Sequence, residues 1–145
     1  MGWLLHWRIP ILILLIAACG LGWAQAPRVM TLKATAYTSS ARETDSTPFI
    51  TATGARTRIG IIAVSRDMLH ELPYGSKVML EDLGTHRGRG KGRFNYLFKG
   101  RVFVVEDTMH PRKRDQLDVW LPDRGTAIRF GVRNVRVTVI RRGRG

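Results

Sequence analysis

The sequence predicts a mainly β domain that closes into a barrel. Short runs in which apolar and polar residues alternate recur along the chain, turn-forming residues separate them, and only two short segments have helical character. Six or seven such strands fit into residues 27–145, with no internal repeat and no second domain. We expect a barrel because a closed barrel leaves no unpaired strand edge.

Residues 1–26 are predicted to be an export signal that precedes this domain. Arg8 is their only charged side chain, residues 9–18 are apolar, and small residues follow. The uncharged run is slightly shorter than the roughly 20 residues of a spanning helix, so a removed signal is favoured over an uncleaved anchor. We therefore expect the protein in the periplasm or cell envelope.

Two routes of processing are open for this signal. The sequence Ile-Ala-Ala-Cys ending at Cys19 is similar to a bacterial lipobox and would place a lipid on Cys19. Ordinary cleavage after Ala24 or Ala26 is the alternative. Both routes leave a mature domain without a disulfide, because Cys19 is the only cysteine in the chain.

The first half of the domain is predicted to hold four strands and one short helix. Ser65 follows an apolar strand and suits the N-cap of a helix that runs through His70. Because Asp caps a helix as well as Ser does, we expect Ser65→Asp to be tolerated. The strands are expected at residues 30–37, 49–54, 59–64 and 77–80, with a polar loop at 39–48 and a turn at 73–76.

The second half is predicted to hold three further strands, one helix and a basic tail. Residues 102–105 are continuously apolar, as in a strand buried on both faces that ends at Glu106 and Asp107. Asp123 is expected to cap a helix that ends at Gly131, and residues 134–140 alternate as a closing strand. The tail at 141–145 is expected to fray.

Residues 116–121, joined to the preceding strand by a charged turn, form the most informative strand. Leu117, Val119 and Leu121 share one face, so Asp118 and Trp120 share the other. Asp is depleted in strands. Its position therefore indicates either a wetted outer face or a functional site.

Residues 85–100 are a basic, glycine-rich segment with aromatic residues two apart. Its first half is expected to lack a fixed backbone, and its second half to extend like a strand. One interpretation is a solvated hairpin tip whose aromatic side chains pack on the barrel. The other is a surface for polyanions, which in an exported protein means anionic envelope polymers contacting residues Arg87 to Arg93 and no specific nucleic acid. We expect deletion of 87–93 to leave the fold intact.

Several kinds of chemistry find no support in the sequence. The histidines show no metal-ligand spacing, and the glycines at 88, 90 and 92 lack the setting of a phosphate-binding loop. No serine lies in a nucleophile elbow. We expect neither a metal nor a cofactor.

Seven short motifs follow one another along the domain, at residues 34–38, 50–54, 60–64, 73–78, 106–108, 117–120 and 129–135. They occur in the order found in the three-aspartate (3D) domain family, which the chain resembles from about Lys33 to Ile140. The resemblance implies a six-stranded double-psi β-barrel with one or two short helices, similar to those of membrane-bound lytic transglycosylase A and the stationary-phase survival muralytic proteins. It further implies cleavage of peptidoglycan between N-acetylmuramic acid and N-acetylglucosamine, with a 1,6-anhydro product.

The resemblance also implies roles for individual residues. The second family aspartate falls on Asp107, and the third, catalytic one falls on Asp118. Ser65 stands where the first aspartate is expected, and a bulky basic turn at 109–114 replaces small residues. Implied substrate-binding residues are Tyr37, Thr53, Gly54, Lys77, Thr108, His110 and Trp120.

One carboxyl group suffices for this reaction. An acid protonates the glycosidic oxygen, and the resulting carboxylate accepts the proton of the sugar's own 6-hydroxyl. A second carboxylate nearby favours the protonated form of the first, a role open to Asp107, which alternatively only caps a turn. We expect an enzyme acting on peptidoglycan glycan strands. The alternatives are a non-catalytic barrel that binds envelope glycan and a polyanion-binding protein driven by the net charge of +13.

Overall fold

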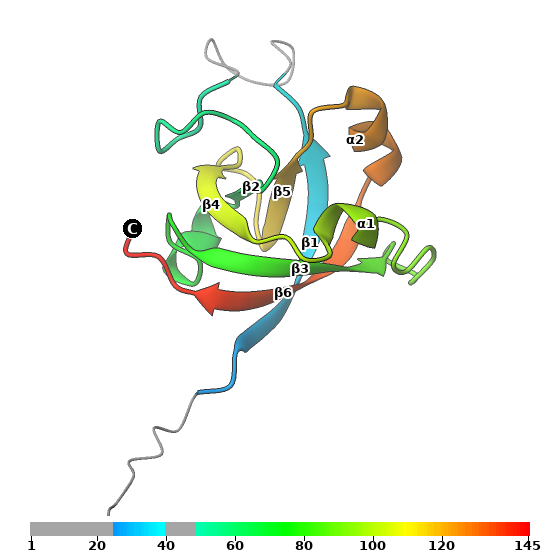
Figure 1. Cartoon of the computed structure of the whole chain (residues 1–145), viewed down its shortest axis with the longest axis horizontal. Coiled ribbons are helices and arrows are strands. Elements are labelled where there is room, and N and C mark those ends of the chain that lie inside the picture. The colour runs from blue at the N-terminus through cyan, green and yellow to red at the C-terminus, as the bar shows by residue number, and fades with distance from the viewer. Residues whose placement is uncertain (1–24, 40–48) are drawn as a thin grey trace, which may run out of the picture.

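Six strands form one closed barrel in the computed structural model, which describes residues 25–39 and 49–145 (Figure 1). Most of the expected export signal, Cys19 included, and the expected loop after Ser39 lie outside the described residues. Within those residues no helix is long and apolar enough to cross a membrane. The strands are β1 (Arg28–Tyr37), β2 (Ile61–Val64), β3 (Lys77–Gly84), β4 (Phe103–Thr108), β5 (Gln116–Trp120) and β6 (Arg133–Arg141). The helices are η1, a 3₁₀ helix (Arg66–His70), α1 (Asn95–Phe98) and α2 (Arg124–Phe130).

The order of strands around the barrel differs from their order in the chain. The closed order is β1-β5-β2-β4-β3-β6. Strand β1 pairs in parallel with β5, strand β2 pairs in parallel with β4, and β2 pairs antiparallel with β5. The two strands predicted within residues 101–121 are therefore not a hairpin, because β2 lies between them. This interleaving brings four distant segments onto one wall of the barrel.

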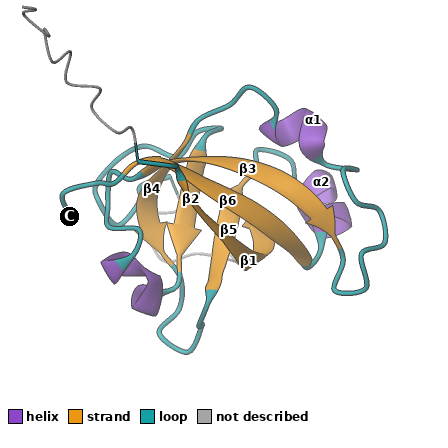
Figure 2. Cartoon of the chain, turned by 90° about the horizontal axis from the view of Figure 1, so that it is seen from below, coloured by secondary structure: helices purple, strands orange, loops and turns teal. Residues whose placement is uncertain are grey.

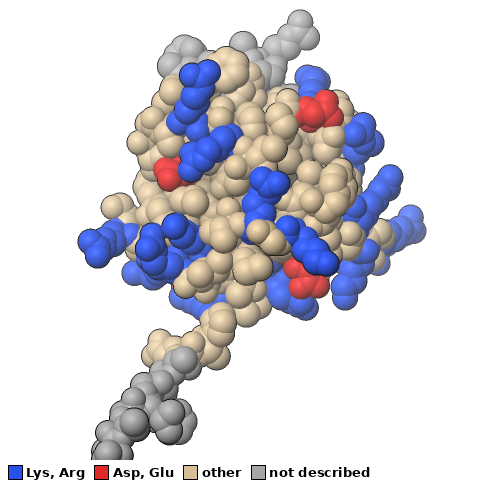
Figure 3. All heavy atoms as spheres, in the orientation of Figure 1, with Lys and Arg blue, Asp and Glu red and all other residues tan. Residues whose placement is uncertain are grey.

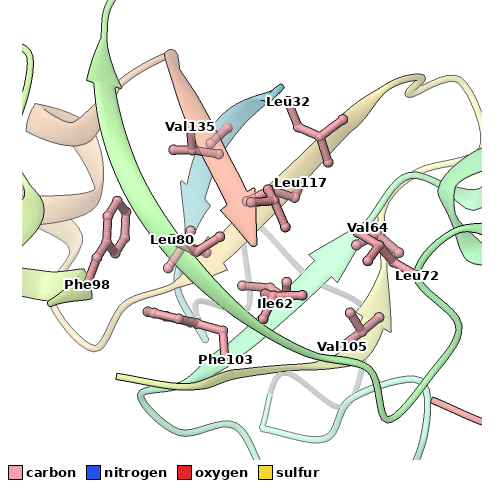
Figure 4. Close-up of a cluster of buried hydrophobic side chains, with 14 of the residues drawn as sticks. Leu32, Ile62, Val64, Leu72, Leu80, Phe98, Phe103, Val105, Leu117 and Val135 are labelled. Atoms are coloured by element: carbon pink, nitrogen blue, oxygen red, sulfur yellow. The ribbon is translucent and has the colours of Figure 1, made fainter. Parts of the chain in front are cut away.

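The core is filled from alternate positions of all six strands, as the period of two requires (Figure 4). Each fully buried Leu, Ile, Val or Phe side chain stabilises the fold by roughly 1.5–3 kcal/mol. The alternation predicted for residues 30–37, 116–121 and 134–140 is confirmed, and the strand predicted at 77–80 also alternates. The strand residues in the core are Leu32, Ala34, Ile62, Val64, Val78, Leu80, Phe103, Val105, Leu117, Val119, Val135 and Val137.

Helices α1 and α2 lie on the same side of the barrel in both views (Figures 1 and 2). Buried aromatic rings join them: Phe94 lies edge-on to Phe130 at 5.1 Å, and Phe98 contacts Phe103 and Phe130 at 5.7 and 6.0 Å between centroids. The expectation that residues 94–98 extend like a strand is wrong, because they form a helical turn that places Phe94 and Phe98 inward. The interpretation that aromatic side chains of this segment pack on the barrel holds for Phe94 and Phe98 but not for Tyr96, and the segment is not a hairpin tip.

Helix α2 ends where the sequence predicts. The Asp123 carboxylate accepts hydrogen bonds from the N–H groups of Gly125 and Thr126 at 3.3 and 2.7 Å. Gly131 follows the last turn with a φ of 60°, which favours glycine. The cap and the end of this helix are thus local properties of the chain.

Two predicted strands need correction. Residues 49–54 form a turn and not a strand, because Gly54 has a φ of 81° and the Thr51 N–H bonds to the Ala55 carbonyl at 2.8 Å. Strand β4 is not buried on both faces: Phe103 and Val105 lie in the core, whereas Val104 is only half-buried. A barrel wall has a single interior face, which explains this alternation.

The basic C-terminal tail does not fray. The Gly143 N–H donates to Ser76 Oγ at 2.9 Å, and the Arg142 guanidinium donates to the His70 carbonyl at 2.7 Å. A Cβ atom on Gly143 would lie 2.0 Å from the Tyr74 carbonyl oxygen, so only glycine permits this approach. The chain end is docked on the predicted turn at 73–76.

Candidate functional site

The two predicted aspartates lie in one row across four neighbouring strands. The register pairs Thr35 on β1 with Asp118 on β5, Asp118 with Ala63 on β2, and Ala63 with Asp107 on β4. Neighbouring strands lie about 4.8 Å apart, so the backbones at Asp118 and Asp107 are about 10 Å apart. Paired residues face the same side of a sheet, so the two carboxylates share the outer face with the small Ala63 between them.

Asp118 opens into a groove, here called the Asp118 groove. Its neighbours Leu117 and Val119 are buried in the core, while Asp118 itself is half-buried on the outer face. The Thr35 hydroxyl donates to Asp118 Oδ1 at 2.8 Å and orients the carboxyl group. The groove has a volume of about 500 Å³ and is lined by Thr35, Ala36, Tyr37, Asp118, Arg124, Ala127, Ile128, Gly131 and Val132.

Tyr37 contacts Asp107 and also lines the groove of Asp118. Its hydroxyl donates to Asp107 Oδ2 at 3.4 Å, and its side chain lines the Asp118 groove. Burial raises the pKa of Tyr37 above its ordinary value, and the charges of Asp107 and Asp118 raise it further. The phenol therefore stays protonated at physiological pH and acts as a hydrogen-bond donor.

Asp107 serves as an acceptor for the protein itself. Its Oδ1 accepts the N–H groups of Ala52 and Thr108 at 3.0 and 2.9 Å, and its Oδ2 accepts the Tyr37 hydroxyl. These bonds hold the turn at 51–55 against β4. Asp107 therefore organises a turn, as one of the two sequence interpretations expects, and it also contacts Tyr37, a residue of the Asp118 groove; its expected effect on the protonation of Asp118 stays a prediction.

The other predicted binding residues are spread more widely. Thr53 and Gly54 lie on the turn over β4, where the Thr53 hydroxyl bonds to the Glu106 carboxylate and to Thr51. Thr108 ends β4, and its Oγ1 accepts the Tyr74 hydroxyl at 3.4 Å. None of these residues lines the Asp118 groove.

Lys77 and His110 also lie outside the groove. Lys77 begins β3 and pairs with Val104 and Arg141. His110 is exposed on the turn between β4 and β5, where its Nδ1 accepts the N–H of Arg112 at 3.2 Å. The structure therefore does not place either of them beside Asp118.

Trp120 lines a neighbouring hollow of about 370 Å³, here called the Ser39 hollow, which also contains Arg124. Its indole Nε1 donates to Ser39 Oγ at 2.9 Å. Trp120 pairs with Tyr37 along the parallel β1–β5 register, two positions beyond Asp118. Of the predicted binding residues, Tyr37 and Trp120 are thus the two nearest to Asp118 in this register.

Sequence reasoning missed Thr35 and the residues that α2 contributes to the groove. Thr35 carries a local signal, because it lies on the same outward face of β1 as Tyr37. Arg124 and Ile128 carry none, because only the folding of α2 back against β1 brings them there. Among the residues that the structure describes, no group of three or more His, Cys, Asp or Glu side chains could hold a metal ion.

Ser65 does not cap η1 with its side chain. It occupies the N-cap position, but its hydroxyl makes no capping bond. It is fully buried, and its Oγ accepts the N–H of Gln116 on β5 at 3.2 Å while its own N–H donates to the Gln116 carbonyl at 2.9 Å. Ser65 therefore ties β2 to β5.

This geometry reverses the expectation that Ser65→Asp is harmless. The substitution would bury a carboxylate close to Asp67, which already accepts the Asp115 N–H at 3.1 Å. We expect it to lower the free energy of unfolding by about 1–3 kcal/mol, measured by chemical denaturation. Ser65→Ala, which removes the hydroxyl without adding charge, is the control and should cost less; equal losses would contradict the burial argument.

The basic segment is held by buried groups. The Gly92 N–H donates to the Asp82 carbonyl at 3.0 Å, and the Arg133 guanidinium donates to the Gly90 carbonyl at 2.6 Å. Within the segment the Thr85 N–H donates to the Arg89 carbonyl at 3.0 Å. The expectation of an unfixed backbone is wrong, and deletion of 87–93 would remove partners of a buried ion pair.

Comparisons with known proteins give a weak structural likeness. No family model and no curated protein matches the chain. The fold is similar to two crystal structures of MltA from E. coli, one described as a unique lytic transglycosylase fold, at 20% and 19% identity and TM-scores of 0.44 and 0.45. A third structure, MltA with bound chitohexaose, is 14% identical over 65% of this chain and 28% of that one, with a TM-score of 0.42. The first two matches cover 70% of this chain, which spans 30% of those MltA chains, so the likeness carries no conclusion about activity.

Proposed function

We propose that this protein cleaves peptidoglycan between N-acetylmuramic acid and N-acetylglucosamine and leaves a 1,6-anhydro sugar. The observation that carries the proposal is the placement of Asp118, a half-buried carboxyl that is oriented by Thr35 and opens into a groove of about 500 Å³. The ordered motifs of the 3D family provide further support. A groove of this size lies within the roughly 300–1,000 Å³ typical of ligand sites.

In this proposal Asp118 acts first as acid and then as base. Its protonated carboxyl donates to the glycosidic oxygen, and the bond from that oxygen to C1 of the muramic acid breaks. The 6-hydroxyl oxygen of the same sugar then bonds to C1, and the Asp118 carboxylate accepts the hydroxyl proton. The enzyme returns to its starting state, and no water is consumed.

Tyr37 and Thr35 would support this chemistry without exchanging protons. The Thr35 hydroxyl fixes the direction of the carboxyl, and Tyr37, whose pKa is raised by burial, presents a protonated phenol at the groove wall. Asp107 keeps Tyr37 in place and holds the turn at 51–55. Asp107 is thus proposed as a positioning residue.

The proposal includes the fold type and the location. Interleaved parallel pairs, β1 with β5 and β2 with β4, support assignment as a double-psi barrel. Since peptidoglycan lies outside the cytoplasm, residues 1–26 would act as an export signal before the domain at 27–145, with Cys19 as a candidate lipid anchor. No cofactor takes part.

A second candidate is a barrel that binds envelope glycan without cleaving it. The observation that favours it is Ser65, which stands where the family has its first aspartate. Its hydroxyl accepts the N–H of Gln116 on β5, and its side chain lines neither the Asp118 groove nor the Ser39 hollow. Purified sacculi separate the candidates. Release of soluble 1,6-anhydromuropeptides, identified by mass spectrometry, is expected for the enzyme, whereas retention on sacculi without release would favour the binding barrel.

We also propose that the basic segment contacts anionic envelope polymers. Arg87, Arg89 and Lys91 are exposed on a backbone that is tied to the core. Lys and Arg side chains are widely spread over the face in Figure 3, and acidic ones are few. Polyanion binding through such groups weakens as salt rises.

Replacement of Arg87, Arg89 and Lys91 by Gln is expected to weaken binding to inorganic polyphosphate and to make its salt dependence shallower. Stability should change by less than about 0.5 kcal/mol, because the replaced side chains are exposed. The matched control replaces Lys33, Arg141 and Arg144, which are also exposed but lie outside the basic segment, and removes the same charge. Equal weakening by both triple variants would show that net charge alone determines binding.

A further inference from the structure

We propose that the glycan site continues beyond Asp118 into a second hollow between α1 and α2, where Tyr96 and Trp120 hold one more sugar unit of the same strand. The identity of the ligand rests on the proposed function. This hollow, here called the Tyr96 hollow, has a volume of about 160 Å³. That is below the roughly 300–1,000 Å³ of a self-contained site, so it suits one unit at the end of a longer ligand.

The three hollows are neighbours that share lining side chains. Arg124 lines both the Asp118 groove and the Ser39 hollow. Trp120 and Pro122 line both the Ser39 hollow and the Tyr96 hollow. Strand β5 advances about 7 Å from Asp118 to Trp120, so the track leads away from the carboxyl along the strand. Such a track fits a linear polymer better than a compact small molecule.

Tyr96 has no evident role in folding. Its side chain is 68% exposed, whereas Phe94 and Phe98 on either side of it are 3% and 1% exposed. Its ring lies against the buried Phe94 ring at 6.2 Å between centroids, which restrains it before any ligand arrives. An exposed, restrained aromatic ring at the rim of a hollow is typical of a binding surface.

The lining of the Tyr96 hollow matches the two kinds of surface on a sugar. Ile59, Trp120 and Tyr96 supply apolar and aromatic contact for the C–H face of a pyranose ring. Arg101 supplies a polar, positively charged side chain at the same hollow for ring substituents. Arg101 and Arg124 place two positive charges along the track against the one negative charge of Asp123, which also lines the Tyr96 hollow, so the net charge suits the carboxylates of the peptides attached to muramic acid.

The test is an NMR titration of the full-length protein with chitobiose and chitohexaose, which carry the N-acetylglucosamine units of the glycan. We expect the wild type to bind the hexamer at least about tenfold more tightly than the dimer. Tyr96→Ala should weaken hexamer binding by about tenfold and leave dimer binding unchanged. Alanine suits the helical turn of α1, and an unchanged spread of amide resonances would show that the variant is folded.

Ile140→Ala is the matched control, since Ile140 is 51% exposed on β6 and lines none of the three hollows. It should bind both oligosaccharides like the wild type. Equal hexamer affinity in Tyr96→Ala and wild type, or no preference for length in the wild type, would overturn the inference. Digestion of sacculi tests the proposed function separately. If no anhydro product forms, transglycosylase activity is rejected. If the wild type still prefers the hexamer and Tyr96→Ala does not, glycan binding at the Tyr96 hollow is supported even then.

Discussion

Asp118→Asn is expected to slow the release of 1,6-anhydromuropeptides from sacculi by about 10²–10⁴-fold, the usual contribution of a general acid–base group. The amide keeps the shape of the side chain and still accepts the Thr35 hydroxyl, which now donates to Asp118 Oδ1 at 2.8 Å. It has no titratable proton, so both proton transfers are lost. The thermal midpoint should change little, because the substitution leaves no cavity on the outer face.

Two further variants make this result specific. Asp107→Asn is expected to lower the rate less, since Asp107 acts through Tyr37 and the turn at 51–55. Asp115→Asn is the control, because it neutralises a carboxylate next to β5 that lies outside the Asp118 groove, and it should leave the rate unchanged. Asp115 is exposed, and asparagine tolerates its φ of 50°. Equal product from wild type and Asp118→Asn would refute the catalytic assignment, because no other carboxyl group lines the Asp118 groove among the described residues.

Arg133→Met is expected to lower the free energy of unfolding by about 3–5 kcal/mol, the cost of leaving a buried charge without its partner. Arg133 Nε donates to Asp82 Oδ1 at 2.8 Å, and the two side chains are 4% and 0% exposed. The guanidinium also lies 4.7 Å from the centroid of the Phe94 ring and donates to the Gly90 carbonyl. Its loss should therefore loosen the basic segment first, seen as faster amide hydrogen exchange at 85–93.

Arg136→Met is the matched control on the same strand. Arg136 pairs with Glu81, but these side chains are 45% and 42% exposed, so the pair is worth less than about 1 kcal/mol. Denaturant titrations of both variants test the difference. Similar losses from the two substitutions would show that burial does not strengthen the Asp82–Arg133 pair.

The buried Asp82–Arg133 pair also predicts how the stability of the protein changes at acidic pH. Burial by itself would raise the pKa of Asp82, but the Arg133 guanidinium and the N–H groups of Phe94 and Gly84 outweigh it, so the pKa lies below its ordinary value. The ionised Asp82 carboxylate therefore stabilises the folded state. This stabilisation is complete above about pH 4 and is lost as the pH falls through the lower folded-state pKa of Asp82. The wild type should therefore lose more stability than Arg133→Met on acidification below pH 4, as measured by denaturant midpoints.

The sequence by itself determined the features that depend on neighbouring residues. The alternation of residues 116–121 was sufficient to place Leu117 in the core and Asp118 on the outer face, because side chains in a strand change sides at every residue. Asp123 and Gly131 were sufficient to bound α2, since caps act within a few residues of a helix end. The mainly β class follows from the same short-range periods.

Only the tertiary structure decided what surrounds Asp118. Thr35 and Asp118 are 83 positions apart in the chain, and no local pattern encodes a pairing over that distance. The interleaved strand order, the buried role of Ser65 and the anchoring of the basic segment by Arg133 likewise depend on contacts between remote segments. Periodicity shows which way a side chain faces, whereas the register and packing of distant strands determine what it faces.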